Sequence, residues 1–437
     1  MRMWTDTVTL PSNWQVASLK ALARPTRQWR PASEPFESIR YVDVSAISRD
    51  LARIEATQAI RAEEAPSRAR KLLEKDDVIY ATVRPTLRRI ALVDHTDENL
   101  IGSTAFCVVR VDSGKALSRY VYYAMRSDPF NAEVALHESG ASYPAVRDHH
   151  VLNAKIPLPP LDEQRRIAAI LWKVQRAIEV QEQLIATVRE LKQAAMRQLF
   201  TRGLRGEAQK ETEIGMVPES WEVVPLGRLG RIGNGSTPKR DNQAFWRGGT
   251  TPWLNSGKIH EGVIEAADQF VTDMAVSECH LPIVRAGSIL VAITGQGKTL
   301  GNVARVNFDT TVNQHLAYLM FSDVQVDADF VRYFLASRYD ALRAIGSAGG
   351  STKGAITCAD LKQFLVPRPP TLPEQHEIAT ALQTIDRKLA HHERKRDTLQ
   401  ELFKTLLHEL MTGRIRVHEL DIDITTLAGE STGGAAT

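Results

Sequence analysis

Two segments of the chain carry apolar residues at alternating spacings of four and three, the pattern of a helix that buries one narrow stripe. They run from 161 to 205 and from 372 to 415, and each predicts a long helix. A heptad stripe of this length is typical of helices that pair, so we expect an antiparallel coiled coil rather than two helices lying on their own domains. The stripe residues are Ile167, Leu171, Val174, Ile178, Ile185, Val188 and Leu199 in the first helix and Ile378, Leu382, Ile385, Leu389, Leu399, Phe403, Leu406 and Leu410 in the second.

The sequence that leads into each helix occurs twice. A Pro-Pro pair is followed by Glu-Gln-x-x-Ile-Ala, which begins at Glu163 in the first copy and at Glu374 in the second. Each half also opens with a proline, two further residues and a tryptophan, Trp14 and Trp221. A repeat of this length indicates that one large domain and one long helix were duplicated, because solenoid repeats are far shorter.

The segments that precede the helices mix strand and helix patterns. We therefore predict a mixed α/β fold of two domains, each followed by a long helix. The predicted parts are a first domain at 1–160, a helix at 161–205, a second domain at 206–371, a helix at 372–415 and a tail at 416–437 whose end is disordered. Within the domains, buried strands are predicted at 78–83 and 288–293, and helices at 119–125 and 330–342.

Composition narrows the class of protein without deciding it. The chain has 437 residues and a formal net charge of +3, which permits an anionic partner but does not require one. No apolar run is long enough for a membrane span, and no signal peptide is visible, so we expect no membrane association. Three widely separated cysteines suggest reduced thiols and a cytoplasmic protein.

The sequence offers no convincing catalytic or metal site. Gly295 to Thr299 resembles the end of a phosphate-binding loop, but the position that requires the first glycine is Ala292, inside a predicted strand. Residues after Thr299 indicate a hairpin rather than the helix that such a loop needs. The adjacent histidine pairs have no carboxylate or cysteine at metal-ligand spacing, so no metal site is predicted.

Taken together, the order of these motifs resembles the specificity subunit of type I restriction-modification enzymes. Two divergent domains, each followed by Pro-x-Pro-Pro, Glu-Gln-x-x-Ile-Ala and a heptad helix, span nearly the whole chain. In the second domain, residues 235–238, 245–246, 251–254 and 312–315 resemble the family's target-recognition domain; in the first, 41–44, 82–85 and 103–106 resemble a different variety.

That resemblance implies a non-catalytic subunit that recognises double-stranded DNA. Each domain would read one half of an asymmetric, split target. The paired helices would set the spacing and dock two methyltransferase subunits, with restriction and translocase subunits completing the complex. S-adenosylmethionine, ATP and magnesium would bind to those partners and not to this chain.

Long polar side chains in loops are the candidate DNA contacts, because base edges and phosphates are read by such donors. Each one alone is as easily a solvated surface charge. The candidates are Arg84, Arg88 and Arg89 in the first domain and Lys239, Arg240, Asn242, Lys258, Gln296, Lys298 and Lys353 in the second.

Two other functions remain open from the sequence. The chain could serve an enzyme whose partner fuses nuclease and methyltransferase, or it could be a coiled-coil scaffold whose domains bind proteins. Basic, amide-rich loops favour nucleic acid, whereas apolar patches would favour a protein partner.

Overall fold

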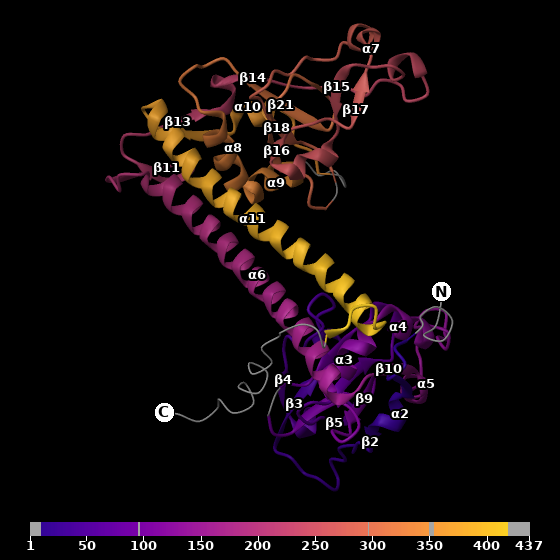
Figure 1. Ribbon diagram of the computed structural model, residues 1–437. Coiled ribbons are helices and arrows are strands. Elements are labelled where there is room, and N and C mark those ends of the chain that lie inside the picture. Colours follow the sequence, from indigo (N-terminus) through magenta and orange to yellow (C-terminus); the bar gives the residue numbers. More distant parts are fainter. Residues whose placement is uncertain (1–9, 95–96, 296, 349–353, 418–437) are drawn as a thin grey trace. The chain divides into compact units, whose positions relative to one another are not determined.

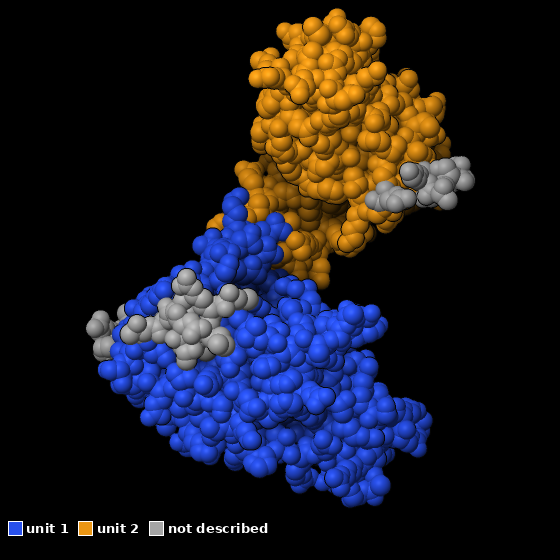
Figure 2. All heavy atoms as spheres, turned by 90° about the vertical axis from the view of Figure 1, so that its right-hand side faces the viewer, with its two compact units in different colours: residues 1–183, 393–437 blue, residues 184–392 orange. Residues whose placement is uncertain are grey.

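The computed structural model describes residues 10–94, 97–295, 297–348 and 354–417. It divides into two compact units, residues 1–183 with 393–437 and residues 184–392 (Figure 2). The two long helices, α6 (Leu161–Arg202) and α11 (Leu372–Met411), each contribute one half to each unit. Each half of a long helix therefore belongs to the compact unit of one domain, whereas the prediction from the sequence treated each helix as a part of its own.

The first unit is built on two four-stranded sheets (Figure 1). One has the order β2 (Ala23–Arg24), β9 (Phe106–Val111), β6 (Val78–Ala81), β7 (Ile90–Leu92), and the other β4 (Gln58–Arg61), β3 (Ser38–Val42), β8 (Leu100–Ser103), β5 (Ala69–Leu72). A separate pair joins β1 (Gln15–Ser18) to β10 (Lys155–Leu158). Its shorter helices are α2 (Leu19–Leu22), α3 (Ser118–Arg126), α4 (Asp128–Ala135) and α5 (Asp148–Asn153).

The second unit follows a similar plan, but its two sheets have five and three strands. Its main sheet has the order β14 (Gly230–Asn234), β21 (Leu316–Phe321), β18 (Ile289–Ala292), β19 (Val303–Val306), β16 (Val263–Ile264), and a smaller sheet has β17 (Gln269–Val271), β15 (Thr251–Leu254), β20 (Thr311–Val312). The strand pairs are β13 (Glu222–Pro225) with β22 (Leu365–Arg368) and β11 (Gln209–Thr212) with β12 (Gly215–Pro218). Its shorter helices are α7 (Asp273–Glu278), α8 (Ala328–Ser337), α9 (Tyr339–Ala348) and α10 (Cys358–Gln363).

The order of strands confirms the duplication predicted from the sequence. In each unit a central strand, β6 or β18, lies between the antiparallel neighbours β9 and β7 or β21 and β19. In each smaller sheet two strands run parallel, β3 with β8 and β15 with β20. The two domains are therefore copies of one mixed α/β fold.

The repeated Glu-Gln motif anchors each helix start to its own domain. The indole Nε1 of Trp14 donates to Glu163 Oε2 at 2.9 Å, and that of Trp221 donates to Glu374 Oε1 at 3.2 Å. The following glutamines are buried and bind main-chain groups in both copies. These buried polar groups are satisfied, which gives the repeated motif a structural role.

Both long helices end earlier than predicted. α6 ends at Arg202 and α11 at Met411, because Gly203 (φ 62°) and Gly413 (φ 67°) adopt the left-handed conformation that terminates a helix. Gly413 lies against Pro11 and Trp14, so the end of α11 packs on the start of the first domain. Arg416 and Val417, which we had assigned to the tail, are also held there: Val417 is buried, and Arg416 Nε donates to Glu163 Oε1 at 2.9 Å. The rest of the predicted tail lies outside the described residues.

The predicted stripe forms part of both cores. All fifteen stripe residues are buried or half-buried. In the first unit Ile178 of α6 and Phe403 of α11 belong to one core, and in the second Phe200 of α6 and Leu382 of α11 do.

Among the described residues, no helix is long and apolar enough to cross a membrane. The helix predicted at 330–342 is wrong as one element, because the chain breaks at Arg338 between α8 and α9.

Glu182 on α6 gives a prediction for the stability of the protein. Burial raises the pKa of this carboxyl above its ordinary value, although Arg396 opposes the effect. A raised pKa means that the folded state is favoured while Glu182 is protonated and is penalised as the pH rises through that pKa. We expect Glu182→Gln to raise thermal stability at pH 7, by about 0.5 kcal/mol or less for a half-exposed group. Melting curves at pH 7 and below pH 4 test this, since the gain should vanish at the lower pH. The matched change Glu401→Gln, at an exposed position of α11, should show no such pH-dependent gain.

Candidate nucleic-acid interface

In the second domain, three loops meet at one edge of the main sheet. β14 and β18 end where their antiparallel neighbour β21 begins, since Asn234 pairs with Ala317 and Ala292 with Leu316. The loops that follow β14 and β18 and the loop that precedes β21 therefore share this edge. Gly235 opens the first loop, and a Cβ there would collide with the carbonyl oxygen of Val312. Glycine lets the chain pass close to its neighbour and present the following polar residues.

A chain of hydrogen bonds links these three loops. Thr237 Oγ1 donates to Gln314 Oε1 at 2.6 Å, which leaves the Gln314 amide nitrogen 3.2 Å from His315 Nε2. The other ring nitrogen, His315 Nδ1, lies 2.5 Å from Thr294 Oγ1. Because each group fixes the next, the edge presents amide and hydroxyl groups in a set orientation, as direct reading of base edges requires.

Arg240, in the loop that follows β14, stacks on Trp246 and on Trp253 of β15. Its guanidinium carbon lies 4.0 Å from the ring centre of Trp246 and 4.6 Å from that of Trp253. Its Nη1 donates to Gln269 Oε1 at 2.7 Å. The stacked rings restrict the side chain, so an exposed cation is held ready to meet an anion at little entropic cost.

The other predicted contacts of this domain differ in how free they are. Lys239 and Lys298 are exposed. Lys258 makes ion pairs with Glu261 (2.9 Å) and Asp268 (3.0 Å), which raise the pKa of its ammonium group and occupy it within the domain. The Asn242 side chain caps a turn by accepting from Ala244 N. Gln296 and Lys353 lie outside the described residues.

The first domain has a corresponding edge. There β6 ends beside the start of β9, where Ala81 pairs with Phe106. Arg84 follows β6 with φ 50°, and its amide donates to Pro144 O at 2.7 Å, which joins a third loop to the edge. The Arg84 guanidinium lies 5.2 Å from the ring centre of Tyr143, and that tyrosine is 73% exposed. Each domain therefore holds an arginine against an aromatic ring in a loop that leaves its main sheet. Arg84 lies in the loop after β6, and Arg240 lies in the loop after β14.

The two neighbouring arginines are engaged within the domain. Arg88 pairs with Asp128 at 2.5 Å but is still exposed. The Arg89 guanidinium donates to the carbonyl oxygens of Val44 and Ile47, so it holds the chain between β3 and β4. Of the three predicted arginines, Arg84 is exposed and contacts an aromatic ring rather than a carboxylate or a carbonyl oxygen.

Comparison with known proteins decides the family. A family model described as the type I restriction modification DNA specificity domain matches residues 11–190 and again residues 218–401. The chain belongs to this family.

Individual relatives of this specificity subunit agree. It is 26% identical over 424 residues to the putative type I restriction enzyme MjaX specificity subunit of Methanocaldococcus jannaschii, across 94% of this chain and 96% of that protein. A solved chain from work on complex assembly and conformational transition of the type I R-M system matches with a TM-score of 0.56 and 26% identity, over 93% of this chain and 100% of that one. The type I S subunit from M. genitalium shares the fold, with a TM-score of 0.60 at 16% identity over 94% of this chain and 99% of its own. The predicted function, a type I specificity subunit with two recognition domains, is confirmed.

Several residues at these edges escaped the sequence-based prediction. Tyr143 was missed because a single tyrosine in a loop carries no pattern. Thr237, Gln314 and His315 lay in segments whose family resemblance we noted, yet nothing in the sequence indicated that they bond to one another. The hairpin predicted after Thr299 is confirmed, since β19 follows and pairs antiparallel with β18. In the described ranges, no three metal-ligating side chains gather at one point.

Proposed function

We propose that this specificity subunit reads a split, asymmetric DNA target, with one half-site recognised at each sheet edge. The observation that carries the proposal is the shared topology of the two edges combined with their different side chains. One edge offers Arg84 on Tyr143, and the other offers Arg240 on two tryptophans beside the Gln314 relay. Copies of one fold with different donors account for unequal half-sites.

The helices are proposed to pair as an antiparallel coiled coil that sets the distance between half-sites. Support comes from each unit taken separately. In the first unit the start of α6 shares a core with the end of α11, and in the second unit the end of α6 shares a core with the start of α11. This arrangement supports helices that run in opposite directions.

Catalysis is assigned to partner subunits. Leu191 of α6 and Leu402 of α11 occupy equivalent places in the repeat and are 53% and 44% exposed, and Leu184 is 37% exposed. Apolar side chains beside a helix stripe are suited to dock two methyltransferase subunits. Restriction subunits would join that complex, and S-adenosylmethionine, ATP and magnesium would bind to the partners. The free cysteines fit a cytoplasmic protein.

Methylation mapping tests this function. The chain is produced with its methyltransferase, and modified positions are read from the DNA of the host. We expect two short defined sequences separated by a constant number of unspecified bases. Affinity for that DNA should rise at least about tenfold when the methyltransferase is added, because a clamp built by several subunits shares the contacts. A single continuous target, or a chain that binds equally well alone at one fixed salt, would contradict the proposal.

A further inference from the structure

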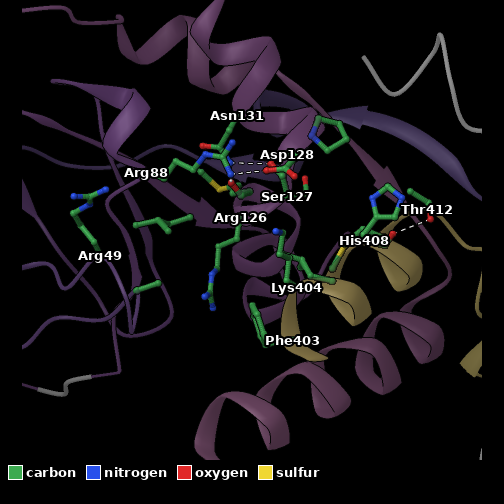
Figure 3. A pocket seen from close by; sticks show the side chains of 16 residues that line it. Arg49, Arg88, Arg126, Ser127, Asp128, Asn131, Phe403, Lys404, His408 and Thr412 are labelled. Atoms are coloured by element: carbon green, nitrogen blue, oxygen red, sulfur yellow. Dashed lines mark hydrogen bonds and ion pairs between the residues drawn. The ribbon is translucent and has the colours of Figure 1, made fainter. Parts of the chain in front are cut away.

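A cavity of about 250 Å³ lies in the first unit where the domain meets the last turns of α11 (Figure 3). Its walls come from the junction between α3 and α4, the segments around Arg49 and Arg88, and residues 403–412, which form the last turns of α11 and the residue after it. In Figure 3, Lys404 extends from α11 toward Asp128. The cavity shares Phe403 with the helix stripe and Arg88 with the loop that follows β6.

The rim of this cavity is basic. Arg49, Arg88, Arg126 and Lys404 line it against one carboxylate, Asp128. Asp128 is already paired with Arg88 at 2.5 Å. Arg49 and Lys404 are exposed, and neither makes an ion pair with any residue that the structure describes. The rim therefore carries cationic charge that the described residues of the unit do not neutralise.

The floor of the cavity is apolar and firmly held. Ile90, Met125 and Met411 line it and are buried. One wall is fixed by Arg126, whose guanidinium lies 4.5 Å from the ring centre of Phe403 and donates to Gln175 Oε1 at 2.7 Å. That arginine is thus used to hold α11 against α3. A preformed apolar hollow with a basic rim fits an acidic side chain that is accompanied by an apolar one.

The other half of the repeat does not reproduce these features on its helix. Gln193 of α6 is the counterpart of Lys404, so the rim cation is missing there. Phe200 is the counterpart of Met411, and its ring packs on Phe330 and Phe334 with centres 5.5 and 5.3 Å away. The lysine and the methionine that α11 contributes to the hollow therefore have no equivalent at the matching positions of α6.

We propose that this cavity receives an acidic residue, with an apolar neighbour, from one of the two methyltransferase subunits, so that the two docking positions are unequal. The inference rests on the proposed function. A protein segment suits the cavity better than DNA, because a phosphate backbone has no apolar group to cover the half-buried Leu407 that also lines the cavity.

The test uses the full chain titrated with its methyltransferase and weighed by native mass spectrometry. Wild type should bind two copies. Lys404→Glu should weaken one of the two binding steps by about tenfold or more, because it places a carboxylate against the incoming acid. One-to-one complexes should then appear at concentrations where wild type is fully two-to-one. Lys404→Ala should show the same loss to a smaller degree. Lys395→Glu, an exposed position on the same helix, is the matched control and should bind as wild type does.

Each other result overturns the inference in a distinct way. Two equal binding steps for Lys404→Glu would remove the cavity from the interface while leaving the proposed function intact. Weaker DNA binding with a shallower salt dependence and unchanged assembly would make it a phosphate site. The segment after Val417 contains Glu419 and Asp421. If its removal abolished the effect of Lys404→Glu, the occupant would be this chain itself. A wild type that binds no methyltransferase would refute the proposed function instead.

Discussion

Inserting four residues after Ala186 and four after Asp397 is expected to lengthen the spacer of the DNA target by one or two base pairs while both half-sites stay the same. The added helix is about 6 Å long at about 1.5 Å per residue. A base pair occupies about 3.4 Å of DNA. Four residues turn a helix through about 400°, only about 40° beyond a full turn, so the apolar stripe continues nearly in phase. Methylation mapping of the variant measures both the half-sites and the spacer.

A two-residue insertion at the same positions is the matched comparison. It turns the helix by about 200° and moves the stripe to the opposite face, which should abolish assembly with the methyltransferase. If the four-residue variant kept the original spacer, or changed its half-site bases, the helices would not set the distance between half-sites.

The long helices could be predicted from sequence because their signal is local and repeated. Fifteen apolar positions at heptad spacing fix the buried face, and a glycine marks each end. Gly203 and Gly413 were predicted to close the two helices and do so, although the predicted segments were drawn a few residues past them, to 205 and 415. The prediction of one helix at 330–342 was wrong because the apolar pattern continues across Arg338, whereas the helical conformation of the backbone is interrupted there.

The candidate site was harder to predict because charge in a loop does not say where that charge is used. Arg89 and Lys258 looked like DNA contacts, yet their partners are a pair of carbonyl oxygens and a pair of carboxylates within the domain. Arg84 and Arg240 looked no different in the sequence. The structure distinguishes them because each guanidinium lies on an aromatic ring. Tyr143 belongs to a loop far along the chain, and the hydrogen bond from Arg84 N to Pro144 O brings that loop close. Such long-range contacts have no local signature.

The duplicated anchors explain how the domains could diverge without losing the scaffold. Trp14 with Glu163 and Trp221 with Glu374 fix each helix start through the same buried hydrogen bond. These contacts lie on the helix side of each domain, and the reading loops lie at the edge of the main sheet. Substitutions in the loops therefore leave the anchors unchanged, and under the proposed function different residues would control the target sequence and the spacing.

This separation leads to the last prediction: Arg84→Glu should impair recognition of one half-site, and Arg240→Glu should impair the other. Loss of a base contact costs about 1–3 kcal/mol, or about 5- to 150-fold in affinity. Each substitution also breaks a stack on an aromatic ring, at 5.2 Å for Arg84 and 4.0 Å for Arg240. Binding of the assembled methyltransferase is measured on the full target, on targets with one half-site scrambled, and on random DNA.

The pattern of losses distinguishes reading of bases from attraction to phosphates. For Arg84→Glu, scrambling the first domain's half-site should cause a smaller loss than it does for wild type, whereas scrambling the other should still weaken binding in full. Arg240→Glu should give the reverse. Lys20→Glu and Arg228→Glu change exposed cations that precede the main sheet in each domain, and they should leave both half-sites readable. Equal losses on specific and random DNA, with a salt dependence reduced by about one counterion, would assign the arginine to the phosphate backbone and leave base reading to Gln314 and its neighbours.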